Sequence, residues 1–406
     1  MDVPKSAYNV LFALSNIVKA SYNCQYEVNH KRPDTYWMSS CYQNLFDLAF
    51  TTLDRPDAHH DKLRIAVNLL LNALIECYPN DTKGILVKNL EIMLQKLGTV
   101  CTQTVNPKSK SQYFEFSEMH SVCCDVLQNF FIALKNDGLS ELYQTLLMML
   151  TSFSMITEDP MLQENLLLAL GTLISNIGED ALMLELQYLI NALLQFAQNS
   201  DDAVGTASLS CIFNVVQIIS FNIKPYVEHI IDVIAFIFYR RDSRIETLTA
   251  ASKLLNGFVC ELDLEFKPYV TQTLDALYNI LLVDIIEVVN EDHLERVDVF
   301  LIESWTVYIN LIKNIFYRNK ERPSGGDYLI WKKHIPAIAD RIQMLCDETH
   351  NQEFIRTYCI VLGNIVEAFK GFYPKDVTEF AVLRASGNAI NSNDWETKKI
   401  GRWLDS

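Results

Sequence analysis

A dense group of acidic side chains could bind a positively charged ligand. Five carboxylates lie between residues 291 and 303, and Arg296 is the only lysine or arginine among them. Carboxylates at this density create a negative field that attracts ammonium and guanidinium groups, although acidic residues often form no more than a solvated helix face. The group therefore indicates either a binding surface for a basic ligand or an exposed helix. Its members are Glu291, Asp292, Glu295, Asp298 and Glu303.

Motifs for catalysis and metal binding are missing from the sequence. His59 and His60 are adjacent, so their imidazoles leave a helix start on different sides and cannot easily share one ion. The glycine pair at 325–326 lies in a polar stretch with no strand before it, and no GxxxxGK[ST], GxSxG, GxGxxG or HExxH occurs. We predict a protein that is not an enzyme and that has neither a cofactor nor a metal site.

The elements that would position such acids are visible as a repeat. LSNIVKA at 14–20 returns as LGNIVEA at 362–368, and an Asn or Thr inside an apolar stretch recurs between them every 42 to 57 residues. This period is typical of helix-pair repeats of the HEAT and armadillo type, with insertions in the longer steps. The series is Asn16, Asn72, Asn129, Thr172, Asn214, Asn256, Asn310 and Asn364. Each amide can either bond a neighbouring helix or face a bound chain; buried amides usually bond within the protein.

A second phrase confirms the phase of the repeat. IKPYVEHI at 223–230 and FKPYVTQT at 266–273 place Pro225 and Pro268 43 residues apart, and proline suits the first turn of a helix. We expect first helices (A) to begin near Ser39, Asp81, Leu139, Ala181, Lys224, Glu265, Leu329 and Asp376. We expect second helices (B) to begin near Lys5, His60, Phe116, Pro160, Ala203, Arg244, Glu291, Asn351 and Asp394, with the Asn series inside them.

These helices predict an all-α HEAT-repeat solenoid of about eight pairs in one continuous array over 1–406. The predicted parts are an orphan B helix at 5–22 and repeats at about 39–79, 81–137, 139–179, 181–222, 224–263, 265–318, 329–374 and 376–405. Polar stretches such as 104–112 and 319–327 are expected to be loop insertions, and the polar last pair a terminal cap. The orphan helix suggests that earlier repeats precede it or that a partner covers its apolar side.

Composition limits the class of protein. Half of the 406 residues are apolar, yet the longest apolar run, 230–239, is too short to span a bilayer, and the start has no basic cluster leading an apolar core. The ten cysteines show no CxxC spacing, as expected of buried thiols in a reducing compartment. The formal charge of −16 argues against direct nucleic-acid binding and favours either a basic partner or simple solubility.

Several phrases resemble the C-terminal half of importin-β. They are FTTLDRPDAHHDKLR, MLQENLLLALGTLISNIGED, SFNIKPYVEHI, LEFKPYVTQTLDAL and KKIGRWLD, collinear over about residues 6–405. The resemblance implies a right-handed superhelix with A helices on its convex side and B helices on its concave side. It implies a nuclear import receptor in the cytoplasm, the nucleus and the nuclear envelope or pore, without membrane insertion. Its implied partners are the importin-α adaptor or basic cargo and Phe-Gly nucleoporins. The GTPase Ran is a further possible partner, although the family's main Ran site is on N-terminal repeats that the resemblance does not include.

The resemblance also implies which residues bind a partner. A basic helix in the concave groove needs carboxylates and aromatic faces, and KKIGRW matches the pattern by which the family's last repeat stacks Trp403 on the adaptor. The other candidates are Trp305, Asp125, Glu164 and the 291–303 acids, with Glu246, Glu353 and Glu367 as further carboxylates. Trp305 could equally pack between repeats. Importin-β carries Gly-Asp on several inner helices where this chain has neutral Asn214, Asn256 and Asn364, which favours a less basic ligand.

Two kinds of function follow from these observations. The first is a transport receptor, with reversible, charge-driven binding of a basic segment and weak contacts to Phe-Gly repeats. The second is a static HEAT scaffold that organises a multiprotein complex. Binding to Phe-Gly repeats distinguishes the two, because only the receptor needs it.

Overall fold

The computed structural model describes residues 3–55, 57–58, 61–105, 107, 109–139, 142–199, 201–240, 243–282, 294–317, 323–348, 351–370 and 376–405. Within these ranges every regular element is a helix, which confirms the predicted all-α class. The chain forms two compact units, Met1–Ala192 and Leu193–Ser406, and each is described by itself.

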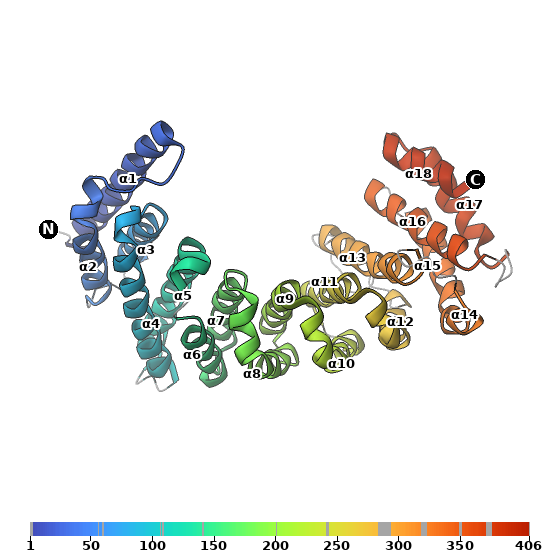
Figure 1. Ribbon diagram of the computed structural model, residues 1–406, viewed down its shortest axis with the longest axis horizontal. Coiled ribbons are helices and arrows are strands. Elements are labelled where there is room, and N and C mark those ends of the chain that lie inside the picture. The colour runs from blue at the N-terminus through green and yellow to red at the C-terminus, as the bar shows by residue number, and fades with distance from the viewer. Residues whose placement is uncertain are drawn as a thin grey trace. The chain divides into compact units, whose positions relative to one another are not determined.

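The first unit stacks its helices in two rows. Figure 1 shows α1, α3, α5 and α7 in one row and α2, α4, α6 and α8 in the other, and each B helix packs on the next B helix. The elements are α1 (Val3–Asn29), η1 (Trp37–Ser40), α2 (Tyr42–Leu53), α3 (Asp61–Glu76), η2 (Asn80–Thr82), α4 (Lys83–Val105), α5 (Lys110–Leu139), α6 (Tyr143–Ile156), α7 (Pro160–Ile174) and α8 (Glu179–Ala197), whose last residues belong to the second unit.

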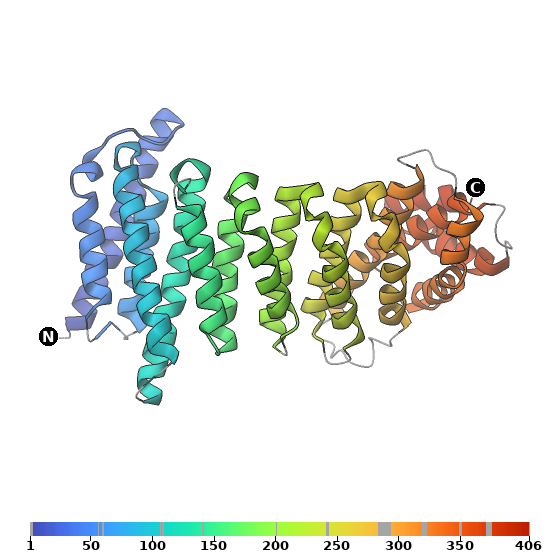
Figure 2. The same cartoon turned by 60° about the horizontal axis from the view of Figure 1, so that its bottom comes forward.

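The second unit continues the alternation. The B helices α9, α11, α13, α16 and α18 pack on one another in order, and Figure 2 brings forward the A helices α10 and α12, which lie side by side. The elements are α9 (Asp202–Ile219), η3 (Ser220–Tyr226), α10 (Val227–Tyr239), α11 (Ile245–Leu262), η4 (Asp263–Tyr269), α12 (Val270–Leu282), α13 (Leu294–Ile312), the π-helical turn η7 (Lys313–Tyr317), α14 (Gly325–Trp331), α15 (His334–Glu348), α16 (Gln352–Ala368), α17 (Asp376–Ile390) and α18 (Trp395–Asp405).

Helix starts follow local capping chemistry. Asp159 precedes Pro160 and its carboxylate accepts hydrogen bonds from the backbone N–H groups of Met161 (3.0 Å) and Leu162 (3.2 Å), so α7 begins where the sequence predicts. Asp201 caps α9 in the same way. Two expectations are wrong: α5 begins at Lys110 and not near Phe116, and α14 begins at Gly325, so the ends of the supposed 104–112 and 319–327 insertions are helical.

The two KPYV phrases form matching turns. Pro225 and Pro268 lie inside the 3-10 turns η3 and η4, and the α-helices begin after them at Val227 and Val270. The first residue of each turn, Ser220 or Asp263, has φ near +45°, where side chains are rarely found (42° and 50°). This shared backbone reversal returns the chain from each B helix to the next A helix.

The core of the second unit contains a chain of aromatic rings. Trp305 contacts Tyr308 and Tyr358, with both pairs of ring centroids 5.7 Å apart. Trp331 of α14 then contacts Phe369 at 5.6 Å. Because these rings come from α13, α14 and α16, they fasten successive repeats together, and aromatic pairs of this kind stabilise a core beyond their buried area.

The segment Asp202–Tyr239 is long and apolar enough, by length and composition, to cross a membrane, which the apolar run at 230–239 alone is not. It is not one straight helix, because α9 and α10 are separated by η3 and the left-handed Ser220. Of its most apolar window, 56% is buried inside the protein. Burial of this extent is what the core helices of a solenoid require.

Candidate functional site

Side-chain amides join the B helices of the first unit. The Asn129 amide donates to the Asn72 side-chain oxygen at 2.9 Å, which links α5 to α3. The Thr172 hydroxyl lies 3.3 Å from the Gln128 side-chain oxygen and 2.9 Å from the Leu168 carbonyl. These residues of the predicted series therefore bond neighbouring B helices in this structure.

The same arrangement occurs in the second unit. The Asn256 amide donates to the Glu303 carbonyl at 3.0 Å and to its carboxylate at 3.2 Å, and the Asn310 amide lies 3.4 Å from the Asn256 side-chain oxygen. The buried Asn364 amide donates to the Ile360 carbonyl of its own helix at 2.6 Å. Asn16 is exposed on α1, and Asn214 lines a pocket described below.

The predicted acidic surface is only partly within the described structure. Glu291 and Asp292 lie outside the described residues, and Glu295 and Asp298 belong to α13 without described side chains. Glu303 is half-buried and bonded to Asn256, as above. The acidic surface over 291–303 therefore stays a prediction, with Glu303 its one member whose side chain the structure describes.

The other predicted carboxylates lie on B helices of both units. Asp125 is exposed on α5, where neighbouring protein withholds part of its hydration and raises the pKa of its carboxyl above the usual value. Glu164 is half-exposed on α7, and Glu353 and Glu367 are exposed on α16. Asp125 and Glu164 belong to the first unit, and Glu353 and Glu367 belong to the second.

Trp305 is not a partner-binding residue. Its side chain is 0% exposed and packs between Tyr308 and Tyr358, so the expectation that it stacks on a ligand is wrong. The physical reason is its position on the buried face of α13, next to the fully buried Ser304. The alternative considered from the sequence, packing between repeats, is what the structure shows.

Trp403 combines packing with exposure. Its side chain is 44% exposed on α18, and the covered part of the ring lies against Gly363 of α16. A Cβ at Gly363 would lie only 2.0 Å from Cη2 of the indole, so no other residue fits beneath the ring. The glycine in LGNIVEA thus positions an aromatic face beside Asn364, at the end of the B-helix row.

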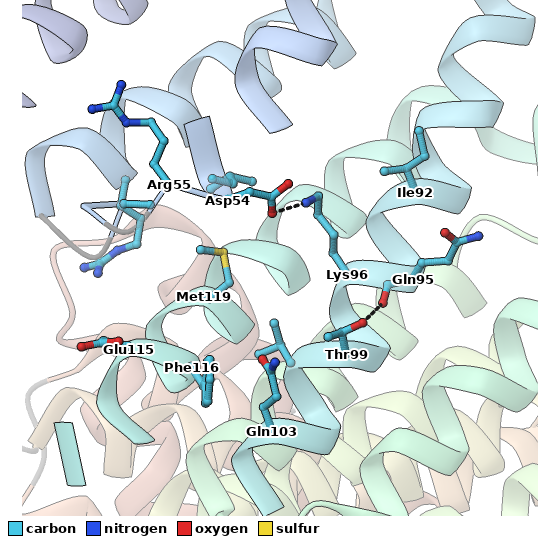
Figure 3. A pocket seen from close by; sticks show the side chains of 14 residues that line it. Asp54, Arg55, Ile92, Gln95, Lys96, Thr99, Gln103, Glu115, Phe116 and Met119 are labelled. Carbon is cyan, nitrogen blue, oxygen red and sulfur yellow. Dashed lines mark hydrogen bonds and ion pairs between the residues drawn. The ribbon is translucent and has the colours of Figure 1, made fainter. Parts of the chain in front are cut away.

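A pocket of about 650 Å³ opens beside the A helix α4, between the end of α2 with the segment that follows it and the first turns of the B helix α5 (Figure 3). This α2–α4 pocket has apolar walls from the end of α2, from α4 and from the start of α5, namely Leu53, Ala58, Ile92, Val100, Phe116 and Met119. Its volume is within the range of small-ligand pockets. Phe116 and Met119 are half-exposed, so the floor can contact an inserted side chain.

Ion pairs surround the α2–α4 pocket. Lys96 binds Asp54 at 2.5 Å, as the dashed line in Figure 3 shows, and its ammonium lies 5.7 Å from the Phe50 ring centroid. Arg55 binds Asp57 through two nitrogens, at 2.8 and 2.7 Å, and Arg64 pairs with Glu118. Sequence reasoning did not select these residues, although Asp54, Arg55, Asp57 and Arg64 belong to the phrase FTTLDRPDAHHDKLR, on which the resemblance partly rests.

A second pocket, of about 490 Å³, lies on the B helices of the second unit. In this α9–α11 pocket, α9 contributes Thr206, Ser210, Phe213 and Asn214. The α11 side contributes Ile245, Glu246, Thr249, Ala250 and Lys253, and Val299 of α13 completes the lining. The Phe213 ring packs on Gly257, whose Cβ would lie 3.1 Å from Cε2.

Burial shifts the pKa values of several thiols and of one imidazole. Burial raises the pKa of the Cys101, Cys123 and Cys211 thiols to about 12, which leaves them protonated and unreactive. Burial lowers the pKa of His120 to about 4, so its imidazole is neutral at pH 7. Among the described side chains no group of three or more His, Cys, Asp or Glu could hold a metal ion.

Comparison with known proteins identifies relatives of the whole chain. Residues 1–381 match the family model for importin subunit beta-1-like proteins, TPR repeats. A crystal structure of importin beta in an ammonium sulfate condition covers 100% of this chain at 13% identity with a TM-score of 0.68. Kap95p, the yeast importin-beta, matches in two further structures. One describes Kap95p binding to RanGDP and covers 100% of this chain at 15% identity with a TM-score of 0.62. The other is the Kap95:Nup1 complex, which covers 100% of this chain at 14% identity with a TM-score of 0.55.

The chain corresponds to part of these proteins, since it covers 46% of the importin beta chain and 45% of each Kap95 chain. At these identities the structures show the fold alone, and that fold is the predicted HEAT-type solenoid. The resemblance drawn from the sequence is confirmed by the family model.

Proposed function

The chain belongs to the importin subunit beta-1-like family, and we propose that it acts as a nuclear transport receptor of the importin-β type. In this role it binds Phe-Gly nucleoporins through grooves between A helices and a basic segment of an importin-α adaptor or cargo along its B helices. It works in the cytoplasm, the nucleus and the nuclear pore. Binding and release, without covalent chemistry, are its activity.

The α2–α4 pocket is the observation that carries this proposal. Its apolar walls and its volume of about 650 Å³ suit a phenylalanine ring, and the glycine that follows in a Phe-Gly motif lets the peptide backbone approach the helices. The Lys96 and Arg64 cations at its rim are paired with carboxylates, so the rim adds polarity without excess charge. The Kap95:Nup1 complex supports a nucleoporin as partner, because Kap95 and this chain share a fold.

A basic segment is the proposed ligand of the B helices. Asp125, Glu164 and Glu303 supply carboxylates on three of them, and Trp403 offers an exposed indole for cation–π contact. The overall charge of −16 favours encounter with a basic partner at low salt. A Ran GTPase is a further proposed partner, since Kap95p is described with RanGDP, and a titration with GTP-loaded Ran tests it.

The proposal is tested by binding of the full chain to a peptide with a single Phe-Gly motif. Ile92→Asp puts a charge into the wall of the α2–α4 pocket and should weaken binding about tenfold or more, because burial of an aromatic side chain is worth about 1.5–3 kcal/mol. Ile65→Asp is the matched control, as Ile65 is 52% exposed on α3 and does not line the pocket.

The result also separates the receptor from the alternative of a static scaffold. A scaffold has no need of Phe-Gly contacts and would bind neither the peptide nor a Phe-Gly repeat domain. If the chain ignores both Phe-Gly repeats and a basic importin-α N-terminal peptide at low salt, the transport function is wrong.

A further inference from the structure

The α9–α11 pocket differs in charge from a site built for a basic helix. Of the described residues that line it, Glu246 and Lys253 are the charged ones, so the formal charges of this described lining cancel in a chain of net charge −16. A wholly basic segment would be repelled by Lys253 about as strongly as it is attracted by Glu246, since like charges repel as strongly as opposite charges attract. The pocket therefore does not select for positive charge.

The two charged residues bracket an apolar floor. They lie seven residues apart on α11, two helical turns or about 10 Å along one face. Ala250 lies between them, with Phe213 of α9 and Val299 of α13 at the sides. Lys253 and Val299 are exposed, so both the rim and the floor are within reach of a partner.

The shape of the floor is set by a close packing contact. The Phe213 ring lies on Gly257, with 3.1 Å and 3.2 Å from the position of a Cβ to Cε2 and Cδ2. A larger residue at 257 would push the ring toward the pocket, so glycine keeps the space open. A single apolar side chain can then enter beside Ala250.

Hydroxyl groups make the rim of the pocket polar without adding charge. Ser210 donates to the Thr206 carbonyl at 2.9 Å and Thr249 to the Ile245 carbonyl at 2.7 Å, so both hydroxyl protons are used within the helices. Their oxygens keep lone pairs that can accept hydrogen bonds from a partner. Such groups accept amide donors of a peptide and do not require a charge.

We propose that the α9–α11 pocket binds a helical peptide segment in which one apolar side chain lies between a basic and an acidic residue. The apolar side chain enters beside Ala250, the basic residue faces Glu246 and the acidic residue faces Lys253. Two turns of a partner helix span the same 10 Å as the two turns of α11. This subsite rests on the proposed function, in which the B helices bind a partner, and it makes that partner mixed in charge and not uniformly basic.

The experiment uses three immobilised, alanine-rich helical 15-mers and the full chain in 50 mM salt, where exposed charge pairs are least screened. Each peptide has a central leucine with charged residues three positions before and four after it: Lys and Glu, Glu and Lys, or Lys and Lys. One of the two mixed peptides should bind about three- to fivefold more tightly than the all-lysine peptide, the range for exposed ion pairs. Replacing the leucine by alanine should weaken it about tenfold.

Variants assign the effect to the pocket. Lys253→Glu should reverse the preference, so that the all-lysine peptide binds more tightly than either mixed one, whereas Lys332→Glu makes the same charge change on an exposed lysine outside the pocket and should leave the order unchanged. Ala250→Phe fills the floor and should remove binding of all three peptides, with the helical circular dichroism signal unchanged.

Equal binding of the mixed and all-lysine peptides to the original chain, or the same preference in Lys253→Glu, overturns this proposal. Loss of peptide binding while the Phe-Gly peptide still binds the α2–α4 pocket overturns the subsite alone. Loss of both overturns the proposed transport function as well.

Discussion

Replacing Gly363 by alanine tests how α16 positions Trp403. The indole would meet the new Cβ at 2.0 Å from Cη2 and 2.3 Å from Cζ3, distances that atoms in contact do not reach. The backbone of α16 is helical at this position, so alanine is itself acceptable there. The ring is therefore what must move, away from α16 and into solvent.

The expected magnitude has two opposing parts. The indole is 44% exposed, so its displacement uncovers roughly 100–150 Å² of apolar surface, worth about 3 kcal/mol. Alanine in a helix is more favourable than glycine by about 1 kcal/mol. Gly363→Ala should therefore lower the free energy of unfolding by about 2 kcal/mol.

A double-mutant cycle isolates the contact. A Trp403→Ala background removes the three atoms nearest to the Cβ position of Gly363, so the same Gly363→Ala change should raise stability by about 1 kcal/mol, the helix preference for alanine. The coupling energy between the two sites is then about 3 kcal/mol. Urea unfolding followed by circular dichroism at 222 nm measures all four chains, with Gly387→Ala as a control, since no atom lies within 4 Å of a Cβ there.

The sign change is the sensitive outcome. If Gly363→Ala has the same effect with and without Trp403, the ring does not rest on α16 and the positioning argument is refuted. If both single changes leave stability untouched, the last repeat does not pack as described.

Three further predictions concern binding, pH and capping. Trp403→Ala should weaken a basic importin-α N-terminal peptide by about 1–3 kcal/mol in a calorimetric titration, and unchanged affinity would leave the indole a packing role only. Burial lowers the pKa of His120 from 6.5 to about 4, so between these pH values the unfolded chain binds a proton more readily than the folded chain does. The free energy of unfolding should therefore fall as pH drops from 6.5 to 4, by up to about 3 kcal/mol for this group. His120→Leu should flatten that pH dependence in urea titrations. Asp159→Ala removes the cap of α7 and should cost about 1–2 kcal/mol by thermal unfolding, whereas Asp159→Asn should retain most of it.

The repeat was predictable because its signals are local. Pro160 after Asp159, the KPYV phrases and the Asn series each depend on neighbouring residues, and helices begin within a few residues of the expected places. The start of α5 was misplaced because Lys110 to Gln112 is polar and resembles the end of a loop. Tyr113 donates to the Asp159 carboxylate in front of α7, a contact between distant residues that no local pattern reveals.

The candidate sites were less predictable because they depend on burial and on pairs distant in sequence. Trp305 and Trp403 both follow polar helical residues, yet only the structure shows that one is fully buried and the other half-exposed. The α2–α4 pocket brings Asp54 and Lys96 together from different helices, which periodicity alone does not reveal. Gly363 and Trp403 each had a visible signal, as a glycine within a helix and as the aromatic residue of KKIGRW, but nothing in the sequence showed that the two are in contact.

The joints between repeats of the second unit are partly ionic, whereas the repeats themselves are held by apolar packing. Lys224 of one KPYV turn binds Glu265 of the next, Lys267 lies 3.5 Å from Asp327, and Arg356 binds Glu396 at 2.8 Å. Salt screens exposed pairs of this kind but not buried aromatic contacts. The contacts between repeats of this unit should therefore weaken as ionic strength rises, while each repeat keeps its own structure.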